Sequence, residues 1–422
     1  MTRIKALLIS TYFSFAMSHT IAQNKSLPSY TVLIDKADTA SFIQTKFNYL
    51  QFSERNLAEK LNFLFLQTKQ RKIKIAHFGD SHVQLDYFPS TVRRLMQRRY
   101  GNAGRGTLFP FSMCKTYSHI DFDSKYKGTW VTANSIQTPP KLPVGILGFV
   151  AQSSDTQSSF TIKFKNSKIE ADDKLELLFS ANAYNYNISV NAGKDFKTPG
   201  VLIDTEKSRN IFRIPVTTDS LMINLIRKNV DSSKISLFGL VLDNDNPGVT
   251  YHNLGIGGSI YSAMLHQTYF SDQFSLLDPD IAVLDWGTND IIYKNSIADD
   301  LESTIIKTVK KLRSQKPEIL IILASVQDMN WKGKNITACK KFNDLISKLA
   351  QQENCLYFDW YQISGGAQSM KKWEQKGLAR KDNIHLTREG YILKGELFFN
   401  AIVNTIELIN GNKKIQRLVF EP

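Results

Sequence analysis

The sequence predicts an α/β protein whose parallel sheet is interrupted by an inserted antiparallel β-sandwich. Short apolar runs alternate with helical patterns from about residue 71 and again after residue 247, which is typical of a parallel sheet covered on both faces. Between residues 115 and 247, short alternating segments are separated by Asn, Asp, Gly, Lys and Ser, which is typical of a sandwich. A chain of 422 residues is long enough for both units to have cores.

The first residues indicate an export signal. Arg3 and Lys5 precede an apolar segment, residues 6–17, and Thr20-Ile21-Ala22 resembles a small-residue cleavage site. The segment is short and interrupted by polar residues, so it is a poor membrane anchor, and no later run is long enough to span a bilayer. We therefore expect residues 1–22 to be a cleaved signal peptide, and the mature protein to be periplasmic or secreted without an integral membrane segment.

The net charge of +14 predicts attraction to polyanions. Nucleic acid is a poor candidate, because the chain has no helix-turn-helix, zinc or aromatic-basic motif. An anionic cell-wall polymer or a membrane surface fits better, and simple solvation of the surface explains the charge equally well. The sequence leaves the oligomeric state open.

Three cysteines, Cys114, Cys339 and Cys355, are too few for a disulfide framework, and none has metal-ligand spacing. Cys339 and Cys355 either pair in an oxidising compartment or remain buried thiols.

Residues 23–70 are expected to form a helical lead segment, since apolar residues recur at helical spacing between positions 41 and 69. Residues 71–114 begin the α/β domain with a buried strand, Ile73 to Phe78, which ends at Gly79-Asp80-Ser81. A helix is predicted over residues 87–100, with Arg93, Arg94, Arg98 and Arg99 on its solvent side. The glycine-rich stretch Gly104-Arg105-Gly106 is interpreted as a turn.

Residues 115–247 are the predicted sandwich, and residues 248–422 complete the α/β domain. The second part has predicted strands at 249–253, 281–286, 319–324 and 356–359. Its predicted helices cover residues 261–277, 301–313, 336–352 and 387 to about 406. In such sheets the functional residues gather beyond the carboxyl ends of the strands.

Loops at that edge supply the parts of an acyl-transfer site. Ser81 follows the first strand as a nucleophile would, and His385 is placed to act as its base, with Asp382 orienting the imidazole. An oxyanion needs N–H donors, and the backbone of Ser81, the backbone of Gly258 and the side chain of Asn289 are the candidates. Each pattern alone is also ordinary turn or helix-cap composition. Their order along the chain favours the catalytic interpretation.

That order resembles the SGNH (GDSL-type) hydrolase superfamily. The matching blocks are Gly79-Asp80-Ser81, Gly258, Gly287-Thr288-Asn289-Asp290 and Asp382-x-x-His385. The resemblance implies a flavodoxin-like three-layer fold, a Ser81–His385–Asp382 triad, and Gly258 and Asn289 in the oxyanion hole. Gly257 departs from the pattern, because the family more often has a polar residue there.

The chain is most similar to the exported peptidoglycan O-acetylesterases of that superfamily, which carry a sandwich resembling a carbohydrate-binding module between the first and second blocks. The supporting residues are His82, Asp86, Gly104-Arg105-Gly106, Pro247-Gly248-Val249, Gly365-Gly366, Trp373 and Asp382 to Thr387. The insert matches only in its position in the chain and in its pattern of short alternating segments.

Four further residues have side chains that could serve a site. His82 is expected to be structural, because a neighbour of the nucleophile points the wrong way to be its base, and His77 is expected to be a core histidine. Arg105 is a candidate contact for an anionic substrate, with a salt bridge as the alternative, and Trp130 is a candidate sugar-stacking residue, with packing as the alternative. No metal or cofactor is required.

The sequence thus predicts a serine esterase that removes O-acetyl groups from cell-wall glycan, peptidoglycan first, through an acetyl-enzyme. The alternatives are an O-acetyltransferase, a deacetylase for another polysaccharide, and a non-catalytic wall-binding protein on a hydrolase scaffold. Which glycan, which hydroxyl and whether the sandwich binds carbohydrate are left open.

Overall fold

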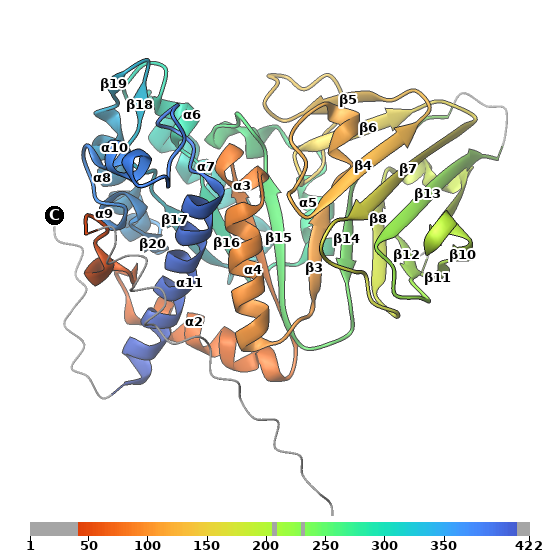
Figure 1. Ribbon diagram of the computed structural model, residues 1–422, viewed down its shortest axis with the longest axis horizontal. Coiled ribbons are helices and arrows are strands. Elements are labelled where there is room, and N and C mark those ends of the chain that lie inside the picture. Colours follow the sequence, from red (N-terminus) through yellow and green to blue (C-terminus); the bar gives the residue numbers. More distant parts are fainter. Residues whose placement is uncertain (1–40, 205–208, 229–232, 412–422) are drawn as a thin grey trace, which may run out of the picture.

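The computed structural model describes residues 41–204, 209–228 and 233–411. The predicted signal peptide, residues 1–22, and the start of the lead segment lie outside this range. Figure 1 shows an α/β domain beside a β-sandwich, with β15, β3 and β14 at the junction between them.

The first sheet has six strands in the order β1-β20-β17-β16-β2-β15. They are β1 (Leu50–Gln51), β2 (Lys72–Gly79), β15 (Gly248–Gly255), β16 (Ile281–Asp285), β17 (Leu320–Ala324) and β20 (Leu356–Phe358). All neighbours are parallel except β1, which pairs antiparallel with β20. The predicted helical lead segment therefore also contributes an edge strand to this sheet.

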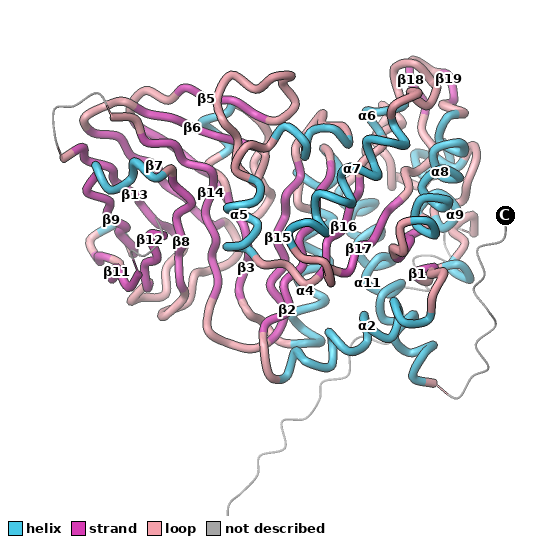
Figure 2. The backbone as a smooth tube through the Cα atoms, turned by 180° about the vertical axis from the view of Figure 1, so that it is seen from behind, coloured by secondary structure: helices cyan, strands magenta, loops and turns pink. Residues whose placement is uncertain are grey.

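Helices cover both faces of the sheet, as Figure 2 shows from behind. The helices are α2 (Arg55–Leu66), α3 (Ser81–Gln84), α4 (Tyr87–Tyr100), α5 (Phe270–Leu277), α6 (Thr288–Ile291), α7 (Leu301–Gln315), α8 (Ala338–Gln352), α9 (Trp360–Ile363), α10 (Ser369–Gln375) and α11 (Arg388–Asn410). Alternate strand residues face opposite layers: Ile75 packs with α2, α4 and α11, whereas Phe78 packs with α5, α7 and α8. This is the predicted three-layer arrangement.

The sandwich consists of two antiparallel sheets. One has the order β11-β12-β8-β14-β6-β5, with β3 also paired to β14, and the other has the order β10-β9-β13-β7-β4. The strands are β3 (Gly104–Leu108), β4 (Phe122–Lys127), β5 (Val131–Asn134), β6 (Phe149–Ser153), β7 (Gln157–Phe164), β8 (Lys174–Phe179), β9 (Tyr186–Ala192), β10 (Thr198–Pro199), β11 (Val201–Asp204), β12 (Arg209–Arg213), β13 (Ser220–Arg227) and β14 (Ile235–Asp243). Short 3-10 turns are the helical elements among its described residues.

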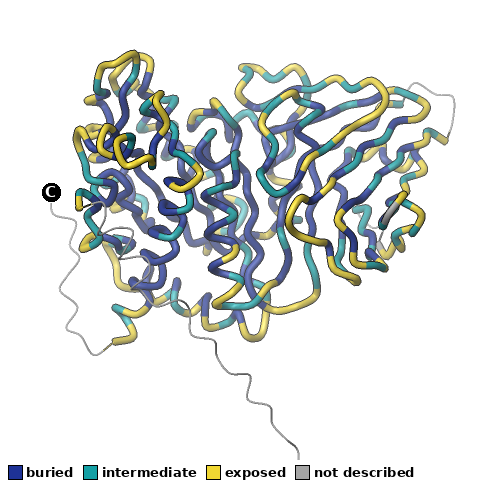
Figure 3. The backbone as a smooth tube through the Cα atoms, viewed as in Figure 1, coloured by how far each residue is buried: buried dark blue, intermediate teal, exposed yellow. Residues whose placement is uncertain are grey.

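The sandwich shares its core with the α/β domain. A single cluster of buried side chains runs from Ile305 of α7 through Phe78 of the parallel sheet to Phe160 of the sandwich. Figure 3 shows buried residues on both sides of the junction. The insert is therefore fused to the α/β domain by apolar packing.

The predicted domain boundary at residue 115 lies one strand too late. Residues 104–108, interpreted as a glycine-rich turn, form β3 and join the sandwich sheet through β14. A Cβ on Gly106 would lie 2.5 Å from the carbonyl oxygen of Tyr251, and one on Gly104 would lie 2.3 Å from the Cα of Asp243. The two glycines therefore serve close approach of β3 to its neighbours, which sequence pattern does not distinguish from a turn.

Two further predictions are corrected. The helix expected over residues 261–277 is divided into a 3-10 segment, Tyr261–His266, and α5, with Gln267 extended between them. Arg93, predicted on the solvent side of α4, is buried, because its guanidinium bonds the carboxylate of Asp86 at the start of the same helix. In the described part of the chain, no helix is long and apolar enough to cross a membrane.

Candidate active site

Ser81, His385 and Asp382 converge at the carboxyl edge of the parallel sheet. The Ser81 Oγ lies 3.0 Å from His385 Nε2, and His385 Nδ1 lies 2.8 Å from Asp382 Oδ2. Ser81 is the first residue of α3, directly after β2 and the Asp80 cap. A hydroxyl, an imidazole and a carboxylate in this chain of contacts have the geometry of a nucleophile, its base and the group that orients the base.

The loop before α11 brings Asp382 back to His385. Asn383 adopts a left-handed backbone conformation, φ +54°, which asparagine tolerates better than most residues. The other carboxylate oxygen, Asp382 Oδ1, accepts the backbone N–H groups of Ile384 and His385, both at 2.9 Å. Partial burial raises the pKa of Asp382, but these N–H groups and the imidazole outweigh it and lower the pKa below its usual value. The ionised carboxylate holds the proton of His385 on Nδ1, so Nε2 faces the Ser81 hydroxyl as an acceptor.

The candidate oxyanion donors other than Ser81 lie on the loop after β15 and at the start of α6. Gly258 has φ +85°, and a Cβ on its neighbour Gly257 would lie 3.8 Å from the Cβ of Ser81. The Asn289 amide enters from α6 and donates one hydrogen bond, 3.0 Å, to the carbonyl of Ser259. An amide carries two N–H groups, so this bond leaves a second donor on Asn289. The three candidate donors thus come from three segments, and the Asn289 amide bonds the residue that follows Gly258.

Gln84 fixes the loop that carries Gly257 and Gly258. Its side chain is fully buried, and its carbonyl oxygen accepts the backbone N–H of Gly257. Its amide donates to the carbonyl of Tyr117 at 2.8 Å and to the hydroxyl of Thr116 at 3.2 Å. Gln84 therefore connects the candidate oxyanion loop with the inserted sandwich, a role that the sequence alone did not indicate.

The ring of His82 lies next to the imidazole of His385. Its ring centre is 5.2 Å from that of His385, and its Nδ1 lies 2.9 Å from the hydroxyl of Tyr391. Burial lowers the pKa of His82 well below its ordinary value, and the nearby His385 adds to the effect, so the ring is neutral. Gln327 lies 3.2 Å from His82 Nε2 and donates to the carbonyl of Ile384 at 2.9 Å. His82 thus supports the His385 loop.

A buried ion pair anchors α11 under the site. Lys394 donates to Asp285 at 2.9 Å, and both side chains are almost completely buried. Desolvation acts to raise the pKa of Asp285, but Lys394 and the nearby His77 lower it overall. His77 is fully buried and lies 2.8 Å from the Tyr251 hydroxyl, as expected for a core histidine. This pair fixes the helix whose preceding loop carries His385.

Arg105 and Trp130, the two candidate substrate contacts, have other partners than the triad. Arg105 donates to Asp121 at 2.9 Å and to Asp86 at 3.2 Å, so its guanidinium is held in an internal ion cluster, the alternative considered for it. Trp130 belongs to the sandwich, where its ring meets Phe160 edge to face and its N–H donates to a backbone carbonyl. In the part of the chain that the structure describes, the partners of these two side chains do not include the triad.

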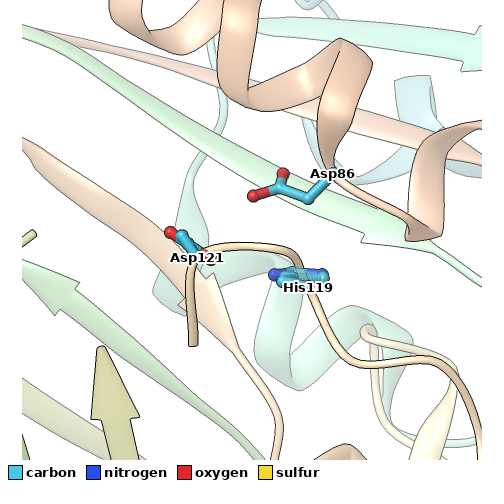
Figure 4. A group of neighbouring side chains, drawn as sticks. All are labelled: Asp86, His119 and Asp121. Carbon is cyan, nitrogen blue, oxygen red and sulfur yellow. The ribbon is translucent and has the colours of Figure 1, made fainter. Parts of the chain in front are cut away.

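The ion cluster joins the two domains. Asp86 comes from the α/β domain, whereas His119 and Asp121 precede the first long strand of the sandwich (Figure 4). Their ligand atoms lie within 4.8 Å of one another, but Arg93 and Arg105 neutralise the carboxylates, and Arg105 donates to Nδ1 of the imidazole at 3.0 Å. Because those atoms already accept hydrogen bonds from guanidinium groups, a cation has little to gain there.

A short hairpin borders the triad loop. It consists of β18 (Asn330–Trp331) and β19 (Lys334–Asn335), and the N–H of Asn330 donates to the carbonyl of Asn383 at 3.0 Å. The Trp331 ring lies edge-on, 5.5 Å from the exposed ring of Tyr293. Tyr293 lies four residues after Asn289 in the sequence, whereas no sequence pattern predicted the hairpin.

The comparisons with known proteins agree with this architecture. The family model for the GDSL-like lipases and acylhydrolases matches residues 219–393. That match includes Gly258, Asn289, Asp382 and His385, whereas Ser81 lies before the insert and reaches the site through β2. Residues 219–393 are therefore similar to the GDSL-like lipases and acylhydrolases.

Among solved structures, a peptidoglycan O-acetylesterase matches 85% of this chain and 99% of its own, with 18% identity and a TM-score of 0.68. An acetyl xylan esterase from Geobacillus stearothermophilus matches 37% of this chain and 73% of its own, with 19% identity and a TM-score of 0.31. A lipase/acylhydrolase from Enterococcus faecalis matches 37% and 77%, with 18% identity and a TM-score of 0.30. No curated protein matches the chain. The first likeness establishes the fold, including an α/β domain combined with a sandwich.

Proposed function

We propose that this protein is an exported serine esterase that removes O-acetyl groups from a cell-wall glycan, with peptidoglycan as the favoured polymer. The observation that carries the proposal is the chain of contacts from Ser81 Oγ through His385 to Asp382, at 3.0 and 2.8 Å. The fold shared with a peptidoglycan O-acetylesterase supports the choice of substrate. Export rests on the N-terminal sequence.

The reaction has two steps. His385 Nε2 takes the Ser81 proton as Oγ attacks the acetyl carbonyl, and the tetrahedral oxyanion is held by N–H donors of Ser81, Gly258 and Asn289. The C–O bond to the sugar then breaks, His385 returns the proton to the sugar oxygen, and an acetyl-enzyme remains. A water molecule, deprotonated by His385, attacks the acetyl carbon; the bond to Ser81 Oγ then breaks, His385 returns the proton to Oγ, and acetate leaves.

Hydrolysis is favoured over transfer by the openness of the triad. The side chains of His385 and Asp382 are 28% and 42% exposed, so water reaches the base without any segment moving. A transferase has to keep water from the acetyl-enzyme until a sugar hydroxyl arrives. The second candidate, glycan O-acetyltransfer, predicts capture of a labelled acetyl group on a sugar acceptor.

The decisive experiment measures acetate released from O-acetylated peptidoglycan and from acetylated xylan by the wild type and by Ser81→Ala. We expect greater release from peptidoglycan, and a loss of about 10⁴-fold or more in kcat for the variant, because a triad acts as a unit. Full activity of Ser81→Ala on p-nitrophenyl acetate would disprove the mechanism.

Two further results would redirect the proposal. Equal or greater release from xylan would displace peptidoglycan as the substrate. Failure of a fluorophosphonate probe to label the folded wild-type protein would favour a non-catalytic wall-binding protein.

A further inference from the structure

The inserted sandwich reaches the loops that surround the nucleophile. After β3, the chain runs through a 3-10 turn, Phe111–Cys114, and then passes the α/β domain before β4 begins. On this passage the carbonyl of Tyr117 and the hydroxyl of Thr116 accept the amide of Gln84, three residues after Ser81. The backbone at Tyr117 is therefore fixed relative to the nucleophile.

The ring of Tyr117 faces the space beside Ser81. A Cβ built on Gly257 would lie 2.9 Å from Oε1 of Gln84, 3.7 Å from Cδ2 of Tyr117 and 3.8 Å from Cβ of Ser81. The ring of Tyr117 and the nucleophile thus both lie beside Gly257. Gly257, the position at which this chain departs from the family pattern, has no side chain to separate them.

Ile136 extends this surface to the next residue of the loop. Its Cδ1 lies 3.8 Å from where a Cβ on Gly258 would be. The turn that carries Ile136 is held in place, since the carbonyl of Ser135 lies 3.1 Å from Nδ1 of His266 in the segment after that loop. Tyr117 and Ile136 both belong to the insert, and both touch the candidate oxyanion loop.

Both side chains are exposed although their backbones are fixed. Tyr117 is 61% exposed and Ile136 is 38% exposed. Exposed apolar side chains grouped beside a reactive centre indicate a surface that a ligand covers. An aromatic ring offers a flat apolar face at small entropic cost, and a pyranose ring presents a matching face of C–H groups.

We propose that Tyr117 and Ile136 form the leaving-group subsite, a wall on which the acetylated sugar ring packs while its acetyl group points to Ser81. The inference rests on the proposed function and deepens it, because it assigns the insert a direct role in substrate binding. A sugar O-acetyl group is joined to its ring through a single oxygen, so the ring has to lie next to Ser81 when the carbonyl is attacked. The contact binds the sugar and takes no part in proton transfer.

The test compares a substrate that has a sugar with one that does not. The wild type, Tyr117→Ala, Tyr117→Phe, Ile136→Asn and Tyr184→Ala are assayed on O-acetylated peptidoglycan fragments and on S-ethyl thioacetate. Tyr184 is a matched control, because it is an exposed tyrosine of the same sandwich. Melting temperatures of all variants show whether each folds as the wild type does.

For Tyr117→Ala and Ile136→Asn we expect KM for the glycan to rise by about tenfold, the scale of losing part of a buried apolar contact, with kcat and thioacetate cleavage nearly unchanged. Tyr117→Phe keeps the ring and should stay within about threefold of the wild type, and Tyr184→Ala should match it. An unchanged KM in Tyr117→Ala, or an equal loss on both substrates, would overturn the subsite while leaving the esterase proposal intact. A wild type that cleaves thioacetate but releases no acetate from glycan would refute the glycan function and the subsite with it.

Discussion

The α/β domain and the sandwich differ in what they bury. Beneath the triad, the α/β domain encloses charged and titratable groups, among them Asp80, Asp285 and Lys394. The sandwich interior is mostly apolar, with Glu176 and His119 as buried exceptions, and pairs such as Lys165–Asp123 lie on its surface. Buried charges cost desolvation energy that apolar packing does not. The buried charged groups are thus concentrated beneath the candidate active site, whereas the sandwich is stabilised mainly by apolar packing.

The contrast is sharpest for ion pairs. Replacing Lys394 by Met leaves the Asp285 carboxylate buried without its cation, and we expect a loss of about 3–5 kcal/mol in the free energy of unfolding. The matched change in the sandwich, Lys165→Ala, breaks an exposed pair and should cost between about 0 and 1 kcal/mol. Urea denaturation of both variants measures the difference. Equal losses would mean that the two regions do not differ in this way.

The two regions should also differ in how their aspartates make stability depend on pH, because the α/β domain buries the carboxyl of Asp80 next to Ser81. Burial raises the pKa of Asp80 to about 7. Between about pH 4 and pH 7 the folded protein keeps this proton, whereas the unfolded chain has released it. The contribution of Asp80 to the free energy of unfolding therefore falls as the pH rises, and it does not change further above about pH 7. Asp80→Asn keeps the acceptor for the His82 N–H and removes the ionisation.

We therefore expect the wild type to lose up to about 3 kcal/mol more stability than Asp80→Asn between pH 5 and pH 8. Asp123→Asn, which removes an exposed aspartate of the sandwich, controls for the change in charge. The measurement is the free energy of unfolding of each variant at pH 5 and at pH 8. An equal change between the two pH values for the wild type and Asp80→Asn would contradict the prediction.

The smallest expected effect lies at the contact between the two regions. Gln84→Leu removes the bonds to Gly257 and to Tyr117, and should reduce kcat on S-ethyl thioacetate by about 10- to 30-fold, since a misplaced oxyanion donor weakens transition-state binding. Gln84→Glu keeps the acceptor for Gly257 and loses only the donors to the sandwich. It should keep more of kcat than the leucine variant. If both variants lose the same amount, Gln84 acts through packing and not through Gly257.

The limits of sequence reasoning lie mainly at close contacts between distant segments. The helix from Tyr87 to Tyr100 was predicted with its observed bounds, because its apolar spacing is local. Arg93 on that helix was placed in solvent, since only the fold reveals that Asp86 and Asp121 meet it. The cysteines, for which two states were left open, are free thiols, and burial raises the pKa of Cys339 and Cys355 to about 12.

The sequence by itself determined the order of the parts: a serine after the first long strand, a glycine loop and an asparagine after later strands, and Asp382 three residues before His385. These are local patterns, because strands, turns and caps depend on neighbouring residues. Only the tertiary structure brought Ser81 within 3.0 Å of an imidazole 304 positions away, and placed Tyr117 of the insert beside Gly257. Such distances depend on how sheets and helices pack across the whole chain, and no local pattern encodes them.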